Sequence, residues 1–343
     1  MLINIKFVSI FILTFGLNVI FNKINFIKDK KNFFKHKNLI SKNITPVFSG
    51  GLLLIITILI FIPVQFYILK LFLFLVFLIG FFSDLNILKS PNLRFLTQVL
   101  TVLTFLIIFE INISSIRIEK VDVLLENYFF NLFFTSLCIL IVINGTNFID
   151  GVNTSVIGYY LILLIALSNL MQIFGSNIIS LEDLNLIIFC LFCLFILNFF
   201  ELLYLGDNGA YLVSLFAGIL LIEITNQNEL ISPYYVVNLL WYPAYENLFS
   251  IIRKIKNKKS VFEPDNFHLH QLLYLFISSR FKIKKISNTL TGCLINLYQL
   301  VFVLFISIDY SNTKYQVTMI FLSTLIYTIS YLILIKINYK SRP

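Results

Sequence analysis

The feature that most constrains this chain is a succession of long apolar runs separated by short polar or charged segments. Of its 343 residues, 59% are hydrophobic and only 13% are charged, whereas a soluble domain carries about 25% charged residues. A transmembrane helix needs about 20 consecutive, mostly apolar residues. The composition therefore excludes a soluble domain, a disordered chain, a secreted disulfide scaffold and a nucleic-acid-binding domain.

The apolar runs predict an all-α polytopic membrane protein with about eleven transmembrane helices. Residues 51–82 are the least regular part, because 32 positions must supply two helices that would ideally use about 40. Pro63 and Gln65 mark the turn between these two helices. We interpret residues 1–343 as a single integral membrane domain. The predicted helices span residues 2–21, 51–64, 68–82, 93–109, 129–143, 156–174, 184–204, 211–225, 235–252, 289–308 and 319–337.

The basic residues predict the orientation of these helices. If the N-terminus lies outside, 21 of the 26 Lys and Arg residues fall on the cytoplasmic side. They concentrate in the first connection, in the loop 253–288 and in the C-terminal tail. Because cytoplasmic loops carry an excess of Lys and Arg, we expect the N-terminus outside and the C-terminus in the cytoplasm. The net charge of +9 is thus a sign of topology.

Polar residues also cluster at the junctions that this topology places on the cytoplasmic face. Carboxylates at membrane depth are costly and indicate function. The clusters are Asp84 with Arg94; Asn144, Asn147, Asp150 and Asn153; Asp207; and Glu246, Arg253, Asp265, His268 and His270.

Each cluster also has a purely structural interpretation. Asp84 could cap a helix, and residues 147–153 could form an ordinary polar turn. The turn 205–209 could equally be an ordinary turn in which glycines supply positive φ. In its functional interpretation, this turn holds Asp207 where backbone N–H groups can also meet a phosphate. His268 and His270 have too few neighbouring ligands for a zinc site. Together, several Asp residues without Cys ligands favour Mg²⁺ shared with substrate phosphates, and nearby Arg and His suit phosphate oxygens.

Six motifs in a fixed order resemble those of the polyprenyl-phosphate N-acetylhexosamine-1-phosphate transferase superfamily, glycosyltransferase family 4. The resemblance covers about residues 45–273. Its undecaprenyl-phosphate GlcNAc-1-phosphate transferase branch is more similar than the phospho-MurNAc-pentapeptide translocase branch. The motifs are Thr45-Pro46 with Gly50-Gly51-Leu52, Gly80 to Asp84 with Arg94 and Gln98, Asn144 to Gly151, Leu205 to Ala210, Pro243-x-x-Glu246 with Arg253-Lys254, and Glu263-Pro264-Asp265 to His270.

The resemblance implies a phosphoglycosyl transferase of the bacterial cytoplasmic (inner) membrane, with its active site facing the cytoplasm. It would transfer a HexNAc-type sugar-1-phosphate from a UDP-sugar to undecaprenyl phosphate, release UMP and so initiate a lipid-linked cell-surface glycan. Mg²⁺, or Mn²⁺ in its place, would clamp the donor diphosphate. The site residues that the resemblance implies are Asp84, Asp150 and Asp207 as catalytic, Asp207 and Asp150 as metal ligands, and Asn147, Arg94, Asn153, His268, His270 and Arg253 as substrate-binding.

Two departures from the family pattern keep a second hypothesis open. Ser83 and Asn153 stand where the family usually or often has Asp. The alternative is a catalytically degenerate member that binds polyprenyl phosphate or organises a glycan assembly complex. A transporter is less favoured because the acidic residues cluster at one end and no inverted repeat is visible. A CDP-alcohol phosphotransferase is disfavoured because Asp150-Gly151 lacks the rest of that motif. The sequence leaves the sugar and the glycan pathway open.

Overall fold

The chain forms a bundle of helices. A computed structural model describes residues 2–24, 48–258, 260, 265–281 and 283–340, and every regular element within these ranges is helical. Its α-helices are α1 (Leu2–Lys23), α2 (Gly50–Phe61), α3 (Tyr67–Asp84), α4 (Pro91–Phe109), α5 (Glu119–Leu125), α6 (Tyr128–Ile149), α7 (Ser155–Phe174), α8 (Leu181–Phe199), α9 (Gly206–Gln227), α10 (Pro233–Leu239), α11 (Trp241–Lys256), α12 (Leu269–Arg280), α13 (Lys284–Ile306) and α14 (Thr313–Lys340).

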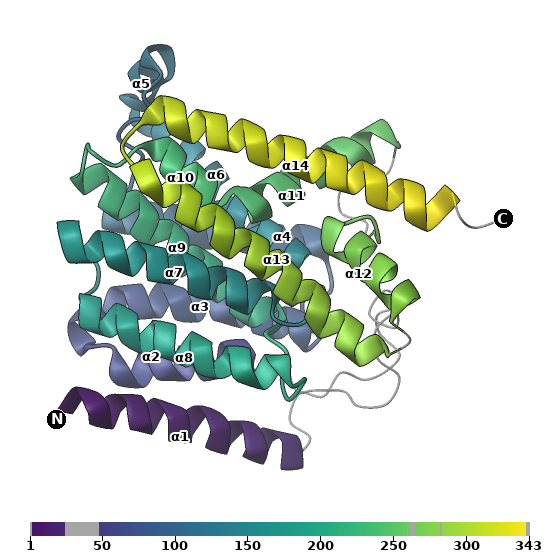
Figure 1. Cartoon of the computed structure of the whole chain (residues 1–343). Coiled ribbons are helices and arrows are strands. Elements are labelled where there is room, and N and C mark those ends of the chain that lie inside the picture. The colour runs from purple at the N-terminus through teal and green to yellow at the C-terminus, as the bar shows by residue number, and fades with distance from the viewer. Residues whose placement is uncertain (1, 25–47, 259, 261–264, 282, 341–343) are drawn as a thin grey trace.

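The arrangement is that of a polytopic membrane protein. Among the described residues, nine helices are long and apolar enough to cross a bilayer, and the shorter α2 is also apolar. The long helices run side by side, with α1 at one edge of the bundle and α14 near the opposite edge (Figure 1). The start of α1 and the end of α14 lie at opposite ends of the bundle (Figure 1). The all-α membrane class is confirmed, whereas the orientation in the membrane stays a prediction.

Two of the eleven predicted spans are not among these nine candidate spans of the described residues: 51–64, which forms only the 12-residue α2, and 235–252. The expected helix 235–252 is divided at Leu240 into α10 and α11, and neither half is long enough to count among the nine candidate spans found in the described ranges. Pro243 explains the division, because it has no N–H to donate to the carbonyl of Leu239 and its ring would clash with that carbonyl in a continuous helix. Two short helices, α5 and α12, are additions that the apolar runs do not predict.

Helix ends also differ from the prediction in a way that matters for the site. The predicted helix 129–143 continues to Ile149, which places Asn144 and Asn147 on the last turns of α6. The predicted helix 211–225 begins at Gly206, which places Asp207 in the first turn of α9. At α4, the Ser90 hydroxyl accepts a hydrogen bond from Leu93 N–H, and Pro91 occupies the first turn. Arg94 therefore lies at the start of a well-defined helix.

Helix α9 lies at the centre of the bundle. In its most apolar segment, 94% of the residues are buried. Two glycines let neighbouring helices approach its first turn closely. A Cβ at Gly80 of α3 would overlap the Cα of Asn208, and a Cβ at Gly51 of α2 would overlap the nitrogen of Gly209. The amides of Gly50 and Gly51 also donate to the Tyr204 and Leu205 carbonyls at 3.0 and 3.2 Å. The Gly-Gly and Gly80 elements of the sequence therefore fix α2 and α3 against the start of α9.

Replacing Gly80 with alanine should force α3 away from α9. Its new methyl group would meet backbone atoms that cannot move independently, so we expect Gly80→Ala to cost at least about 1–3 kcal/mol of stability. The measurement is the thermal midpoint of the detergent-solubilised protein. Gly218→Ala is the matched control, since it lies in α9 with no atom within 4 Å of the added Cβ. A Gly80→Ala midpoint equal to that of Gly218→Ala would contradict this close packing of α3 on α9.

Candidate functional site

The Asp84 carboxylate lies against the first turn of α9. Its two oxygens accept hydrogen bonds from the backbone N–H groups of Asp207 and Asn208, each at 3.1 Å, and from Asn208 Nδ2 at 2.6 Å. A carboxylate is stabilised at this position because the N-terminal N–H groups of a helix carry partial positive charge. Asp84 occupies the amides of Asp207 and Asn208, and the expectation that N–H groups of this turn meet a phosphate stays a prediction.

Asp207 is held by two other residues of the predicted site. Its Oδ2 accepts a hydrogen bond from the Ser83 hydroxyl at 2.6 Å and pairs with Arg94 Nη1 at 3.2 Å. The same Arg94 nitrogen donates to Ser83 Oγ at 2.7 Å. The Asp207 and Arg94 side chains are 20% and 27% exposed, so both can be reached from outside the bundle. The sequence predicted Asp84, Arg94 and Asp207 as site residues, and the structure brings them together.

The end of α6 also reaches the first turns of α9. Asn147 Nδ2 donates to the Tyr211 hydroxyl at 3.0 Å, and Tyr211 is fully buried. Tyr211 did not emerge from the sequence, although its position four residues after Asp207 places the two on one helix face. Asp150 follows as the C-cap residue of α6 and is partly exposed.

A second cluster surrounds His268, the N-cap residue of α12. Its Nδ1 lies 2.9 Å from Glu246 Oε1, and its Nε2 lies 3.3 Å from Asp265 Oδ1. Glu246 is fully buried and also accepts from the Tyr327 hydroxyl at 2.7 Å. Burial opposes ionisation and is the largest single effect, but the hydrogen bonds from His268 and Tyr327 and the nearby imidazoles together hold the pKa of Glu246 below its usual range.

Arg253 completes this cluster. Its Nη2 contacts both Asp265 oxygens, at 3.0 and 2.9 Å, and its Nη1 donates to the Phe267 carbonyl at 2.8 Å. The cluster thus ties the segment before α12 to α11 and α14. In this arrangement His268 and Arg253 organise the loop, and their contacts with substrate phosphates stay predictions. Residues Thr45, Pro46, Glu263 and Pro264 of the motifs lie outside the described residues, as do most Lys residues of the first connection.

His270 connects the second cluster to the end of α6. It is fully buried, and its ring stacks on that of His268 with centroids 5.7 Å apart. Its imidazole fills the space beside Gly151, where a Cβ would overlap Nε2. Burial and the neighbouring His268 lower the pKa of His270 to about 3, against an opposing effect of Glu246. His270 is therefore a neutral packing residue near pH 7, and its contact with a phosphate stays a prediction.

Asn153 contacts residues outside both of these clusters. Its Nδ2 donates to Glu201 at 3.2 Å and to Thr289 at 3.3 Å, and its backbone N–H donates to Asn288. These contacts fasten the start of α7 to α13 and to the turn after α8. The predicted role of Asn153 in binding substrate has no support from these contacts and stays a prediction.

Metal binding can be tested against the residues themselves. Within the described ranges, no group of three or more His, Cys, Asp or Glu side chains is placed to hold a metal ion. Mg²⁺ does not need such a cage, because it keeps several waters and commonly uses one or two carboxylates plus substrate phosphates. Asp207 fits this pattern, since its Oδ1 has no hydrogen-bond partner among the described residues. The assignment of Asp207 and Asp150 as metal ligands stays a prediction.

The buried neutral His270 predicts a pH-dependent stability. Its ordinary pKa is about 6.5 and its pKa in the folded protein is about 3, so the unfolded chain binds the proton more readily. The free energy of unfolding should therefore keep its full value above about pH 6.5 and should decrease as the pH drops below it. We expect the thermal midpoint to decrease between pH 7 and pH 5, and His270→Gln to flatten this decrease. Lys6→Gln, on α1, is the control; equal slopes for both variants would contradict the prediction.

Comparison with known proteins supports the resemblance over the central part of the chain. Residues 66–225 match the glycosyl transferase family 4 model. A probable undecaprenyl-phosphate N-acetylglucosaminyl 1-phosphate transferase of Bacillus subtilis (strain 168) is 30% identical over 149 residues, which cover 41% of this chain and 40% of that protein. The alignment thus spans less than half of the relative's length. The match includes the segments that carry Asp84, Asp150 and Asp207, and the resemblance of this chain to the polyprenyl-phosphate sugar-1-phosphate transferase superfamily is confirmed.

Proposed function

We propose that this protein transfers a HexNAc-type sugar-1-phosphate from a UDP-sugar to a polyprenyl phosphate and releases UMP. The observation that carries the proposal is the convergence of Ser83, Asp84, Arg94 and Asp207 at one end of the bundle, within the segment that matches family 4. A partly exposed carboxylate beside an arginine suits a diphosphate that enters with a divalent cation.

The proposed reaction exchanges one phosphoanhydride for another. An oxygen of the acceptor phosphate attacks the sugar-bearing phosphorus of the donor, and the bond from that phosphorus to the UMP oxygen breaks. UMP leaves with the bonding electron pair, and polyprenyl-diphosphate sugar is formed. Mg²⁺, when bound, would supply charge neutralisation of the diphosphate.

The residues of this chain would orient the phosphates. The guanidinium of Arg94 uses Nη1 for Asp207 and Ser83, and its other nitrogens have no partner among the described residues. They are therefore available to a phosphate oxygen. Asp84 would act as a positioning residue, because its three hydrogen bonds hold the first turn of α9 and with it Asp207. We place this chemistry on the cytoplasmic face of a bacterial inner membrane, on the strength of the basic residues.

The acceptor phosphate would need no side-chain base. Ser83 is a poor base, and Asp84 is engaged with the start of α9. A phosphate monoester has a second pKa near about 6, so most of it is already dianionic at neutral pH. The presence of Ser83 in place of an aspartate is therefore compatible with turnover.

Loss of the Asp207 charge should remove activity. We expect Asp207→Asn to lower the rate of UMP release from UDP-GlcNAc and undecaprenyl phosphate by about 10²-fold or more, because a fixed charge at the reacting diphosphate is lost. Other UDP-HexNAc donors are tested in parallel. Glu119→Gln, an exposed acidic residue of α5, is the control and should keep the wild-type rate.

The outcome also separates the two hypotheses for this chain. The transferase proposal fails if no nucleotide-sugar donor supports UMP release and labelled UMP does not exchange into any donor. Binding of undecaprenyl phosphate under those same conditions would instead support a non-catalytic lipid-binding member of the superfamily.

The absence of a side-chain base predicts a simple pH profile. The rate of the wild type should rise between pH 5 and pH 7 with a midpoint near about 6 and then stay level, because the acceptor phosphate itself titrates. Ser83→Ala should keep this midpoint while lowering the rate by about tenfold or less, since the hydrogen bonds to Asp207 and from Arg94 are lost but no charge is removed. A midpoint that moves by a full pH unit in Ser83→Ala would show that Ser83 takes part in proton transfer.

A further inference from the structure

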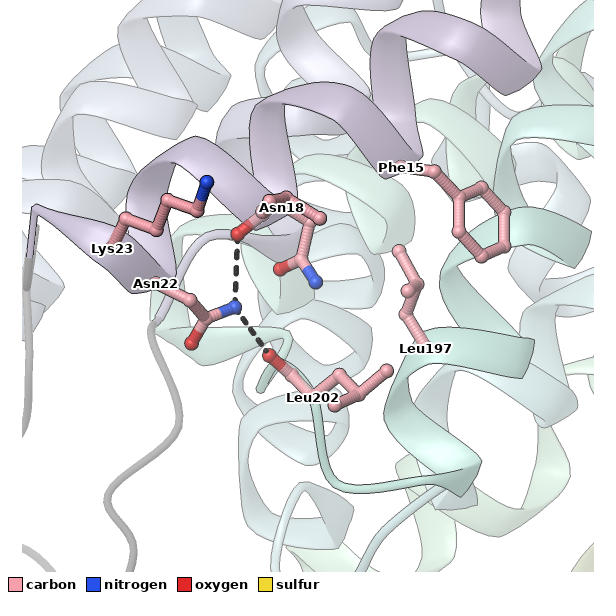
Figure 2. A pocket seen from close by; sticks show the side chains of 7 residues that line it. Phe15, Asn18, Asn22, Lys23, Leu197 and Leu202 are labelled. Carbon is pink, nitrogen blue, oxygen red and sulfur yellow. Dashed lines mark hydrogen bonds between the residues drawn. The ribbon is translucent and has the colours of Figure 1, made fainter.

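A cavity of about 400 Å³ lies between the edge helix α1 and the end of α8, outside the cluster around Asp207. Phe15, Asn18, Val19 and Asn22 form its α1 side, and these residues recur at the spacing of one helix face. Leu197 and Leu202 form the opposite wall, and Lys23 stands at the end of α1 (Figure 2). The cavity therefore combines an apolar wall with amides and one cation.

Asn18 is the unusual member of this lining. The residue is only 3% exposed, although it lies in a helix that is otherwise mostly uncovered by the rest of the protein. Its Oδ1 is buried and has no hydrogen-bond partner among the described residues. A buried polar atom of this kind costs free energy unless a partner arrives. Because Oδ1 is an acceptor, the missing partner must supply an N–H or O–H group.

Asn22 and Lys23 place an N–H donor and a positive charge next to Asn18. Asn22 Nδ2 donates to the carbonyls of Asn18 and Leu202, at 2.9 and 3.2 Å, and so joins α1 to the turn after α8 (Figure 2). Lys23 is exposed and is the basic residue of the last turn of α1. An anionic group at the mouth of the cavity would therefore meet an ammonium group.

The depth of these groups points to a lipid. Helix α1 has 22 residues, a length of about 33 Å that matches the thickness of a bilayer core. Asn18 lies five residues before Lys23, so both fall within the last ~8 Å of the helix, at the level of lipid headgroups. Val19 and Leu202, 52% and 46% exposed, leave the apolar wall open to acyl chains.

We propose that this cavity is a binding site for an anionic glycerophospholipid with a hydroxylated headgroup, of which phosphatidylglycerol is the test compound. The phosphate lies beside Lys23, a headgroup hydroxyl donates to Asn18 Oδ1, and one acyl chain lies along Phe15, Val19 and Leu197. The bound lipid braces the turn after α8, which continues directly into the Tyr204 and Leu205 carbonyls that hold α2.

The proposal is tested by lipid retention. The full-length protein is reconstituted in nanodiscs that contain phosphatidylglycerol and phosphatidylcholine in equal amounts, transferred to detergent and studied by native mass spectrometry. The wild type should retain one phosphatidylglycerol, with at least tenfold preference over phosphatidylcholine. Asn18→Leu and Lys23→Gln should each lower this preference by about fivefold or more. Lys6→Gln, a change on the same helix but far from Lys23, should leave it unchanged.

A cavity-filling variant and a competing lipid complete the experiment. Val19→Trp fills the cavity from an exposed position and should also abolish retention, which keeps the test valid if Asn18→Leu fails to fold. Equal retention of both lipids by the wild type, or wild-type preference in Asn18→Leu and Val19→Trp, would overturn the proposal. Displacement of phosphatidylglycerol by stoichiometric undecaprenyl phosphate would overturn it in favour of an acceptor-lipid site. None of these readouts depends on transferase activity, so the proposed function can fail while this site stands.

Discussion

The interaction on which the rest of the site depends is the contact of the Asp84 carboxylate with the first turn of α9. A carboxylate at the end of one membrane helix neutralises the partial positive charge at the start of another, and it accepts from two backbone amides and one side-chain amide. This contact fixes both the rotation and the depth of α9 relative to α3. Asp207, one of the two residues whose amides donate to Asp84, is thereby presented to Ser83 and Arg94.

Close approach of the helices makes this contact feasible. The carboxylate can reach the amides of α9 only because Gly80, one turn earlier in α3, lets the two backbones come together, as Gly51 does for α2. The second cluster is attached by the same means. Gly145 of α6 faces the Pro243 carbonyl of α11 so closely that a Cβ would overlap it, and Gly151 leaves room for His270. The glycines of the motifs thus allow neighbouring helices to approach closely, and the acidic residues lie at the junctions that this close approach creates.

Much of this could be predicted from the sequence, because hydrophobicity and chain order carry the information. Apolar runs gave the membrane helices, and the alternation of their direction brought Asp84, Arg94 and Asp207 to one end. The division of the predicted helix 235–252 could not be seen in hydropathy, since it depends on the backbone of Pro243. The partners of His268 and Asn153 were equally hidden. Glu246 and Glu201 belong to other segments of the chain, and only the packing of α12 and α13 brings them to His268 and Asn153, whereas Asp265 lies just three residues before His268.

Ser83 changes the electrostatic balance of the site more than its hydrogen bonding. The Ser83 hydroxyl donates to Asp207 and accepts from Arg94. It therefore holds the two side chains next to each other without adding a negative charge. A second carboxylate at the same place would lie within a few ångströms of Asp207. It would repel both the Asp207 carboxylate and a bound substrate phosphate. A site with Ser83 therefore presents less negative charge to two anionic substrates, but it also attracts a divalent cation less strongly. Under the proposed function, more of the cation's binding energy would have to come from the donor diphosphate than from the protein, since Asp207 offers one free carboxylate oxygen.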